Sequence, residues 1–216
     1  VGSKDLQDFE STQMSKNVVT IEEAKKVPPV LGEVDIIKVL QLKPGIQSGG
    51  EGVTGIFVRG GGPDQNLIVL DEAVIYNASH LFGFFSIFNP DIVNAAELYK
   101  GAFPVQYGGR LSSVIDVKLK EGNKNKFGAS GGLGLIASRL TVEGPIQKGK
   151  SSFIISGRRT YVEPFIDYIN NKNKDKPDYD IIPNYYFYDF NAKANVELGK
   201  NDRLLGSFYL GRDAFK

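Results

Sequence analysis

The second half of the chain alternates apolar and polar side chains. Between residues 186 and 198 the even positions are apolar or aromatic, whereas positions 189–197 carry polar side chains at the odd numbers. This period of two predicts a β-strand with one apolar and one wet face. Similar runs cover residues 151–161 and 203–212. A change of phase within 127–143 indicates two shorter strands, 127–134 and 137–146, which makes five strands in all.

The first half combines short β-rich runs with one amphipathic segment. Val34, Ile37 and Leu40 follow helical spacing and predict a helix over residues 33–42, which Lys43-Pro44-Gly45 ends. Branched and aromatic side chains predict short strands at 18–21, 56–59, 67–70, 73–76, 95–100 and 112–120. The two halves therefore differ in class, since a small mixed α/β unit precedes long alternating strands.

Composition narrows the function classes. The chain has 216 residues, a net charge of +1, no cysteine and a single histidine, His80. The charge does not indicate a nucleic-acid surface, and the missing cysteines exclude thiolate catalysis and cysteine-based metal sites. We therefore predict no catalytic residues, no metal site and no cofactor. The chain shows no secretory signal at its start, so an exported protein would be represented here by a mature or excised piece.

A glycine-rich loop separates two of the short strands. Arg59-Gly60-Gly61-Gly62-Pro63 opens it, and taken alone it is also consistent with a simple β-hairpin. Further on come Lys100-Gly101, then Tyr107-Gly108-Gly109-Arg110, then a strand around residues 114–118. In this order and spacing the motifs resemble the plug domain of TonB-dependent outer-membrane receptors. The resemblance covers about residues 18–120 and continues beyond them.

The resemblance implies a domain organisation and a function. Residues 1–17 would be an amino-terminal arm, 18–124 the plug domain and 125–216 the first strands of the barrel. The implied fold class is α+β, with a small mixed α/β plug domain followed by antiparallel strands of an incomplete transmembrane β-barrel. The implied function is not enzymatic. It is active uptake of a scarce nutrient across the outer membrane of a Gram-negative bacterium, driven through the TonB energy-transducing complex.

The resemblance also implies an orientation. The plug would face the barrel lumen and the periplasm. Short turns at 147–150 and 199–202 would lie at the periplasm, and the long segment 163–184 would lie outside. The aromatic residues at 185–188 beside this long segment favour an interfacial girdle.

Two sets of site residues follow from the resemblance. Arg59 and Lys100, which end two strands, would pair with glutamates of the barrel wall beyond residue 216. Loops 61–65 and 77–85 would rise toward the outer mouth and contact a small molecule, a glycan or a peptide. The candidate ligand-binding residues are Asp64, Gln65, Asn77, Ser79, His80 and Phe82. We expect Phe84 or Phe85 to be buried and Phe82 to be the phenylalanine that contacts ligand.

A second class of function also fits the alternation. A soluble or surface-anchored β-rich protein could bind glycans or peptides through aromatic-rich loops, and a β-sandwich or lipocalin-like barrel would alternate in the same way. In that case Arg59 and Lys100 would be ordinary exposed charges at strand ends.

Overall fold

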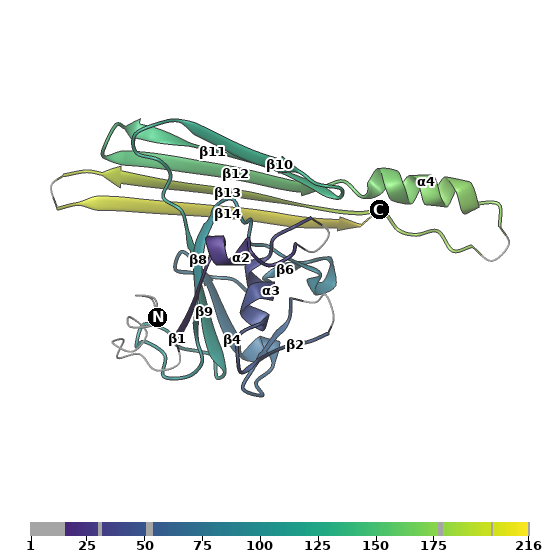
Figure 1. The fold of residues 1–216 in the computed structure, drawn as a ribbon, viewed down its shortest axis with the longest axis horizontal. Coiled ribbons are helices and arrows are strands. Elements are labelled where there is room, and N and C mark those ends of the chain that lie inside the picture. Colours follow the sequence, from purple (N-terminus) through teal and green to yellow (C-terminus); the bar gives the residue numbers. More distant parts are fainter. Residues whose placement is uncertain (1–15, 30–31, 51–53, 177–178, 200, 216) are drawn as a thin grey trace.

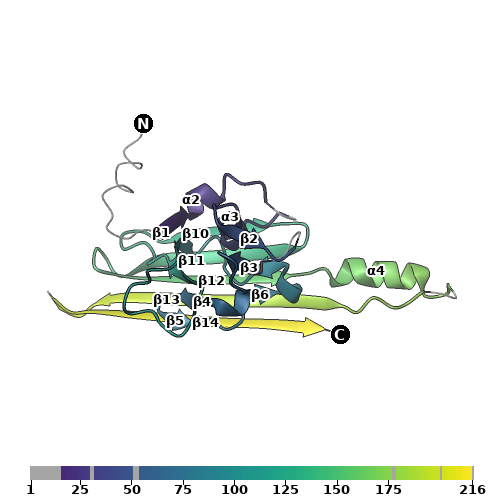
Figure 2. The same ribbon diagram turned by 90° about the horizontal axis from the view of Figure 1, so that it is seen from below.

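A computed structural model of the chain describes residues 16–29, 32–50, 54–176, 179–199 and 201–215. Two parts pack against each other (Figure 1). We call residues 16–120 the amino-terminal unit. The five strands that come after it form one sheet, which we call the long sheet. Seen from below, the unit covers one face of the long sheet (Figure 2). Within the part of the chain that the structure describes, no helix is both long and apolar enough to cross a bilayer.

A five-stranded sheet forms the base of the amino-terminal unit, in the order β1-β8-β9-β4-β5. Its strands are β1 (Lys16–Thr20), β4 (Asn66–Leu70), β5 (Ala73–Val74), β8 (Val93–Tyr99) and β9 (Ser113–Leu119). β4 and β9 run parallel, and the other neighbours are antiparallel. The strand predicted at 73–76 is confirmed only over its first two residues.

The glycine-rich loop does not close a hairpin. β3 (Ile56–Val58), before the loop, pairs with β2 (Ile46–Ser48), whereas β4, after it, pairs with β5 and β9. The loop itself contains the 3₁₀ turn η1 (Pro63–Gln65). The two predicted strands are therefore present, but the hairpin interpretation is wrong because they belong to different sheets.

Two helices pack on this sheet. α2 (Ile21–Ala24) begins with a capping box between Thr20 and Glu23. α3 (Ile36–Gln41) is shorter than the predicted helix because the Asp35 side chain accepts a hydrogen bond from the backbone N–H of Ile37 at 2.9 Å and so caps the helix there. α3 buries four apolar side chains against the sheet: Ile36, Ile37, Val39 and Leu40.

The long sheet confirms the five predicted strands. They are β10 (Gly128–Leu133), β11 (Ala137–Gln147), β12 (Ser151–Thr160), β13 (Tyr185–Glu197) and β14 (Arg203–Phe215), each antiparallel to the next. The short turns after β11 and β13 lie at one end of the sheet, whereas the turn between β10 and β11 and the longer segment between β12 and β13 lie at the other (Figure 1). That segment contains α4 (Glu163–Asn173), which is not among the predicted elements, although the apolar side chains at 165, 168 and 169 have helical spacing.

The two faces of the long sheet differ as the alternation predicts. On β13 the odd positions from 185 to 195 are buried against the amino-terminal unit, and most of them are polar. The opposite face points away from the unit and exposes large apolar side chains. These include Leu140, Val142, Ile155, Phe190, Leu204, Phe208 and Leu210.

Candidate functional site

A buried charged cluster joins the long sheet to the amino-terminal unit. Arg158 of β12 donates to Asp189 of β13 through Nε (2.9 Å) and Nη2 (2.5 Å), and to the carbonyl of Ser86 in the unit (2.7 Å). The side chains of Arg158 and Asp189 are 2% and 0% exposed. Glu33 lies 3.8 Å from the same guanidinium, and burial raises the pKa of its carboxyl in spite of the nearby arginines. Charges as deeply buried as these persist only when they are paired.

His80 lies in the same contact rather than in an open loop. Its Nε2 is 2.7 Å from Asp189 and its Nδ1 is 2.9 Å from Asp213, so carboxylates engage both ring nitrogens. The ring stacks on Phe187 with centroids 4.1 Å apart. A hydrogen bond from His80 to a ligand would therefore require one of these contacts to break.

Further polar contacts extend along the inner face of the long sheet. Arg139 donates through Nε to Asp91 at 2.8 Å, and Lys193 pairs with Asp71 at 2.8 Å. Near the middle of the contact the Asn89 amide donates to the Ser156 hydroxyl at 2.8 Å. A contact made of paired polar groups fixes the position of the unit on the sheet, and it can open without exposing a large apolar core.

The segment after His80 carries the phenylalanine cluster. Leu81 and Phe82 both have positive φ angles, +49° and +53°, and the Leu81 N–H donates to the Tyr185 hydroxyl at 2.7 Å. Phe85 is buried, which confirms that one of the two expected phenylalanines belongs to the core. Phe82 is 87% exposed and lies 5.4 Å from the ring of Phe215, at the end of the sheet that carries α4.

Three of the six candidate ligand residues line one cavity. Asp64, Asn77 and Ser79 surround a space of about 230 Å³ together with Thr54. The Asn77 carboxamide accepts from the N–H of Ser79 at 3.3 Å and so shapes this rim. The structure does not place Gln65, His80 or Phe82 among the residues that line this cavity.

Gln65 lies instead in a cleft of about 440 Å³ with Arg59 and Lys100. The Lys100 ammonium donates to the carbonyl of Pro44 at 2.8 Å. Burial and the positive charge of Arg59 lower the pKa of Lys100. Among the residues that the structure describes, no carboxylate lies within ion-pair distance of Lys100. Lys100 directly follows β8, on the side of the unit far from the long sheet (Figure 1).

Glu97 forms a separate polar cluster near that end of β8. It accepts a hydrogen bond from the Tyr99 hydroxyl at 2.6 Å and pairs with Lys16 at 3.0 Å. Burial alone would raise the pKa of Glu97, but these two partners lower it below its usual value of 4.5.

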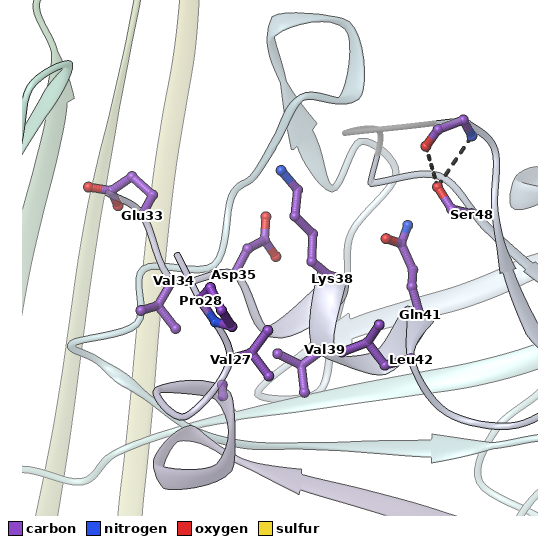
Figure 3. A pocket seen from close by; sticks show the side chains of 12 residues that line it. Val27, Pro28, Glu33, Val34, Asp35, Lys38, Val39, Gln41, Leu42 and Ser48 are labelled. Carbon is purple, nitrogen blue, oxygen red and sulfur yellow. Dashed lines mark hydrogen bonds between the residues drawn. The ribbon is translucent and has the colours of Figure 1, made fainter. Parts of the chain in front are cut away.

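A larger cavity of about 490 Å³ lies beside α3 (Figure 3). Its wall is mainly apolar, with Val27, Val39 and Leu42, and Figure 3 shows Lys38 extending from α3 between Asp35 and Gln41. The Lys38 Nζ lies 4.9 Å from the ring centroid of Phe84 and is buried without a hydrogen-bond partner among the described residues. Burial also lowers the pKa of Lys38.

Sequence reasoning missed most of the charged cluster. The alternation predicts the wet face for Asp189, but it indicates no special role for Asp189 or Arg158. One available signal was the presence of charged residues at central wet-face positions of adjacent strands, where a side chain facing another domain needs a partner. Within the described part of the chain, no group of three or more histidine, aspartate or glutamate side chains is arranged to hold a metal ion.

Comparison with known proteins relates this arrangement to a family. A family model described as TonB-dependent Receptor Plug Domain matches residues 8–114. Among solved structures, the siderophore receptor PirA from Pseudomonas aeruginosa is 16% identical with a TM-score of 0.65, and the alignment covers 95% of this chain and 35% of that one. The alcaligin outer-membrane receptor FauA from Bordetella pertussis is 16% identical with a TM-score of 0.60, covering 94% and 32%.

The FrpB iron transporter from Neisseria meningitidis is 18% identical with a TM-score of 0.57, and the alignment covers 89% of this chain and 31% of the transporter. At these identities the likeness shows the fold. The chain spans about a third of the length of these structures. No curated protein matches the chain.

Proposed function

Because residues 8–114 belong to the plug domains of TonB-dependent receptors, we propose that the chain is the amino-terminal part of such a receptor in the outer membrane of a Gram-negative bacterium. In this proposal the amino-terminal unit is the plug and the long sheet is the beginning of the barrel wall. The receptor takes up a scarce nutrient, and the TonB complex of the inner membrane supplies the energy. It makes and breaks no covalent bond.

One observation carries the proposal. The long sheet binds the plug through a polar face, with Arg158, Asp189 and Lys193 buried, while its other face exposes apolar side chains such as Phe190 and Phe208. A soluble sandwich would bury the apolar face against a second sheet. A barrel wall has the opposite requirement, with apolar residues toward lipid and polar residues toward the lumen.

The proposed ligand residues lie near the end of the long sheet that carries α4. Ser79 begins a segment that contacts the long sheet at the end carrying α4, and Asp64 and Asn77 share its cavity. The turns after β11 and β13 lie at the opposite end and the long segment with α4 at this one, so that this end faces outward in an outer-membrane barrel. We propose that Asp64, Asn77 and Ser79 bind the nutrient by hydrogen bonds, with Phe82 stacking beside them. Gln65 and His80 contribute hydrogen bonds to the nutrient only when the plug rearranges.

We propose a different role for the two strand-end cations. Arg59 and Lys100 line one cleft on the side of the plug away from the long sheet, where the remaining wall of a closed barrel would stand. Two cations held close together lower their mutual repulsion by pairing with carboxylates. Glutamates of the barrel strands that follow residue 216 would be their partners.

A reversible tether between plug and wall tests the proposed function. The side chains of Asn89 and Ser156 meet at 2.8 Å, and the chain has no cysteine to interfere. In the complete receptor, the Asn89→Cys/Ser156→Cys pair should be joined by oxidation or by a short bifunctional thiol reagent. Uptake in live cells should stop when the pair is joined, and reduction or omission of the reagent should restore it.

The two single variants are the matched controls, because each loses the same buried hydrogen bond but cannot form the tether. Both should transport with and without the reagent. Uptake that continues with the tether fully formed would contradict a function in which the plug must move relative to the wall.

The ligand residues need a separate measurement. Replacing Asp64 and Asn77 together by Ala removes hydrogen bonds worth about 0.5–1.5 kcal/mol each, so the affinity of the complete receptor for its nutrient should fall roughly tenfold. The melting temperature should stay unchanged, since Asp64 and Asn77 are exposed. Unchanged affinity would mean that wall and outer loops hold the nutrient.

A further inference from the structure

Two arginines flank a tyrosine on the outward face of the long sheet. In the strand register Arg159 of β12 lies opposite Tyr188 of β13, which lies opposite Arg212 of β14. Residues directly opposite one another point to the same side of a sheet, so all three face away from the plug. The two arginine backbones are two strand spacings apart, about 10 Å, which lets both side chains reach one ligand.

This row lies at the edge of the apolar surface that is nearer to α4. The next outward-facing row toward the middle of the sheet contains Gly131, Leu140, Gly157, Phe190 and Leu210. The glycines at 131 and 157 have no side chains, and a groove of about 1030 Å³ lies over them. Leu140 and Phe190 line the groove, and it reaches Arg159 and Tyr188. The groove therefore has an apolar floor and a cationic end.

The two guanidinium groups are accessible. Arg159 has a side chain that is 61% exposed, lies 5.2 Å from the ring centroid of Tyr186, and pairs with Glu163 at 3.3 Å. Arg212 is exposed and has no ion-pair partner within the described parts of the chain. An exposed pair such as Arg159–Glu163 contributes little stability, so an incoming anion can displace the carboxylate.

We propose that this surface binds a membrane lipid that carries phosphate on its headgroup and several acyl chains. One acyl chain lies in the groove over Gly131 and Gly157, and Arg159 and Arg212 bind the phosphate at the level of the headgroups. The proposal rests on the proposed function, because it places this face toward lipid and this end of the sheet toward the outer leaflet.

Three properties of the site favour this ligand over others. Arginine is the side chain best suited to phosphate, because its planar group donates two parallel hydrogen bonds. The tyrosines at 186 and 188 are amphipathic and suit the boundary between acyl chains and headgroups. A free anion would use only the arginines and leave the groove unexplained, whereas an uncharged lipid would leave the arginines unexplained.

The test uses the complete receptor, purified in detergent, with diphosphoryl lipid A and its fully dephosphorylated form as probes in native mass spectrometry. A basic residue near an anionic headgroup contributes about fivefold in affinity. The double variant Arg159→Gln/Arg212→Gln should therefore bind the phosphorylated probe about 25-fold more weakly than the parent does. The dephosphorylated probe should bind the parent and this variant alike. Glu163→Gln should raise the affinity for the phosphorylated probe, because it removes the carboxylate that competes for Arg159.

The matched control removes two positive charges from the same end of the molecule but not from the site. Lys172→Gln/Lys174→Gln changes exposed residues at the end of α4 and should leave the affinity unchanged. An equal loss in this control would show that net charge alone attracts the lipid and would overturn the site. So would unchanged binding by the arginine variant, or displacement of the lipid by inorganic phosphate at an equal concentration.

Membrane fractionation separates this inference from the proposed function. If the receptor is absent from the outer membrane, the proposed function fails. If it is present there, and the arginine variant melts like the parent but binds diphosphoryl lipid A equally well, only the lipid site fails.

Discussion

The buried pair between Arg158 and Asp189 offers the sharpest test of how the plug is held. Asp189→Asn keeps the size of the side chain but removes its charge. Asp189 accepts hydrogen bonds from Arg158 and from the Tyr209 hydroxyl (2.9 Å), and it lies 2.7 Å from the ring of His80. A carboxamide cannot accept from all three, and its NH₂ group would face other donors.

The cost follows from the burial of the partner. The Arg158 side chain is 2% exposed, so it would remain charged and buried, and Glu33 at 3.8 Å would be its remaining ion-pair partner among the described residues. Removing one partner of a buried pair costs about 3–5 kcal/mol. Since 1.36 kcal/mol corresponds to a factor of ten, the plug–wall contact should open about 150-fold more often, or more.

Opening can be measured by the labelling rate of a buried cysteine. Ser152 faces the plug, its side chain is fully buried, and its hydroxyl donates to the carbonyl of Glu121 at 2.7 Å. In the complete receptor carrying Ser152→Cys, Asp189→Asn should raise the labelling rate by about two orders of magnitude. Glu163→Gln is the control, because it breaks an exposed ion pair worth under about 1 kcal/mol.

The double variant Arg158→Gln/Asp189→Asn provides the internal check. It leaves no unpaired arginine, so it should open less often than Asp189→Asn alone. If Asp189→Asn labelled like the parent, or if the double variant opened more often than the single one, the argument from the buried charge would be refuted.

Three further predictions follow from burial, orientation and charge. Ile37→Asp should lower the free energy of unfolding by several kcal/mol in a melting experiment, because Ile37 is 2% exposed, whereas Leu42→Asp, at a position that is 69% exposed, should melt like the parent. Cysteine in place of Ala192 should react with a lipid-soluble reagent in intact membranes and cysteine in place of Asn191 should not, and equal labelling would contradict a lipid-facing outer surface. Because the pKa of Glu97 is lower in the folded state than its usual 4.5, its stabilising effect is present above pH 4.5 and is lost as the pH falls through the folded pKa. Glu97→Gln should therefore flatten the dependence of melting temperature on pH in this acidic range, and an unchanged pH profile would count against the lowered pKa.

The sequence alone determined the long strands and the main helix of the amino-terminal unit. Alternation over residues 186–198 identified β13 and divided its side chains between two faces, since the side-chain direction in a strand follows from residue parity. Which of the two faces is buried depends on the unit that packs against the sheet. The phase break between 127 and 143 located β10 and β11. The spacing of Ile37 and Leu40 identified α3, and its start differed by three residues because a cap at Asp35 decides that boundary locally.

Only the tertiary structure decided which polar residues are exposed and which are paired. His80 looked like a loop residue able to bind ligand, yet it lies between Asp189 and Asp213, more than 100 positions away in the chain. Asp64 and Gln65 are adjacent in the sequence but line different cavities, because the turn at residues 63–65 directs them apart. Secondary structure arises from periodicities within a few residues. The environment of a polar side chain depends on whichever distant segment packs against it, and no local pattern in the sequence encodes that segment.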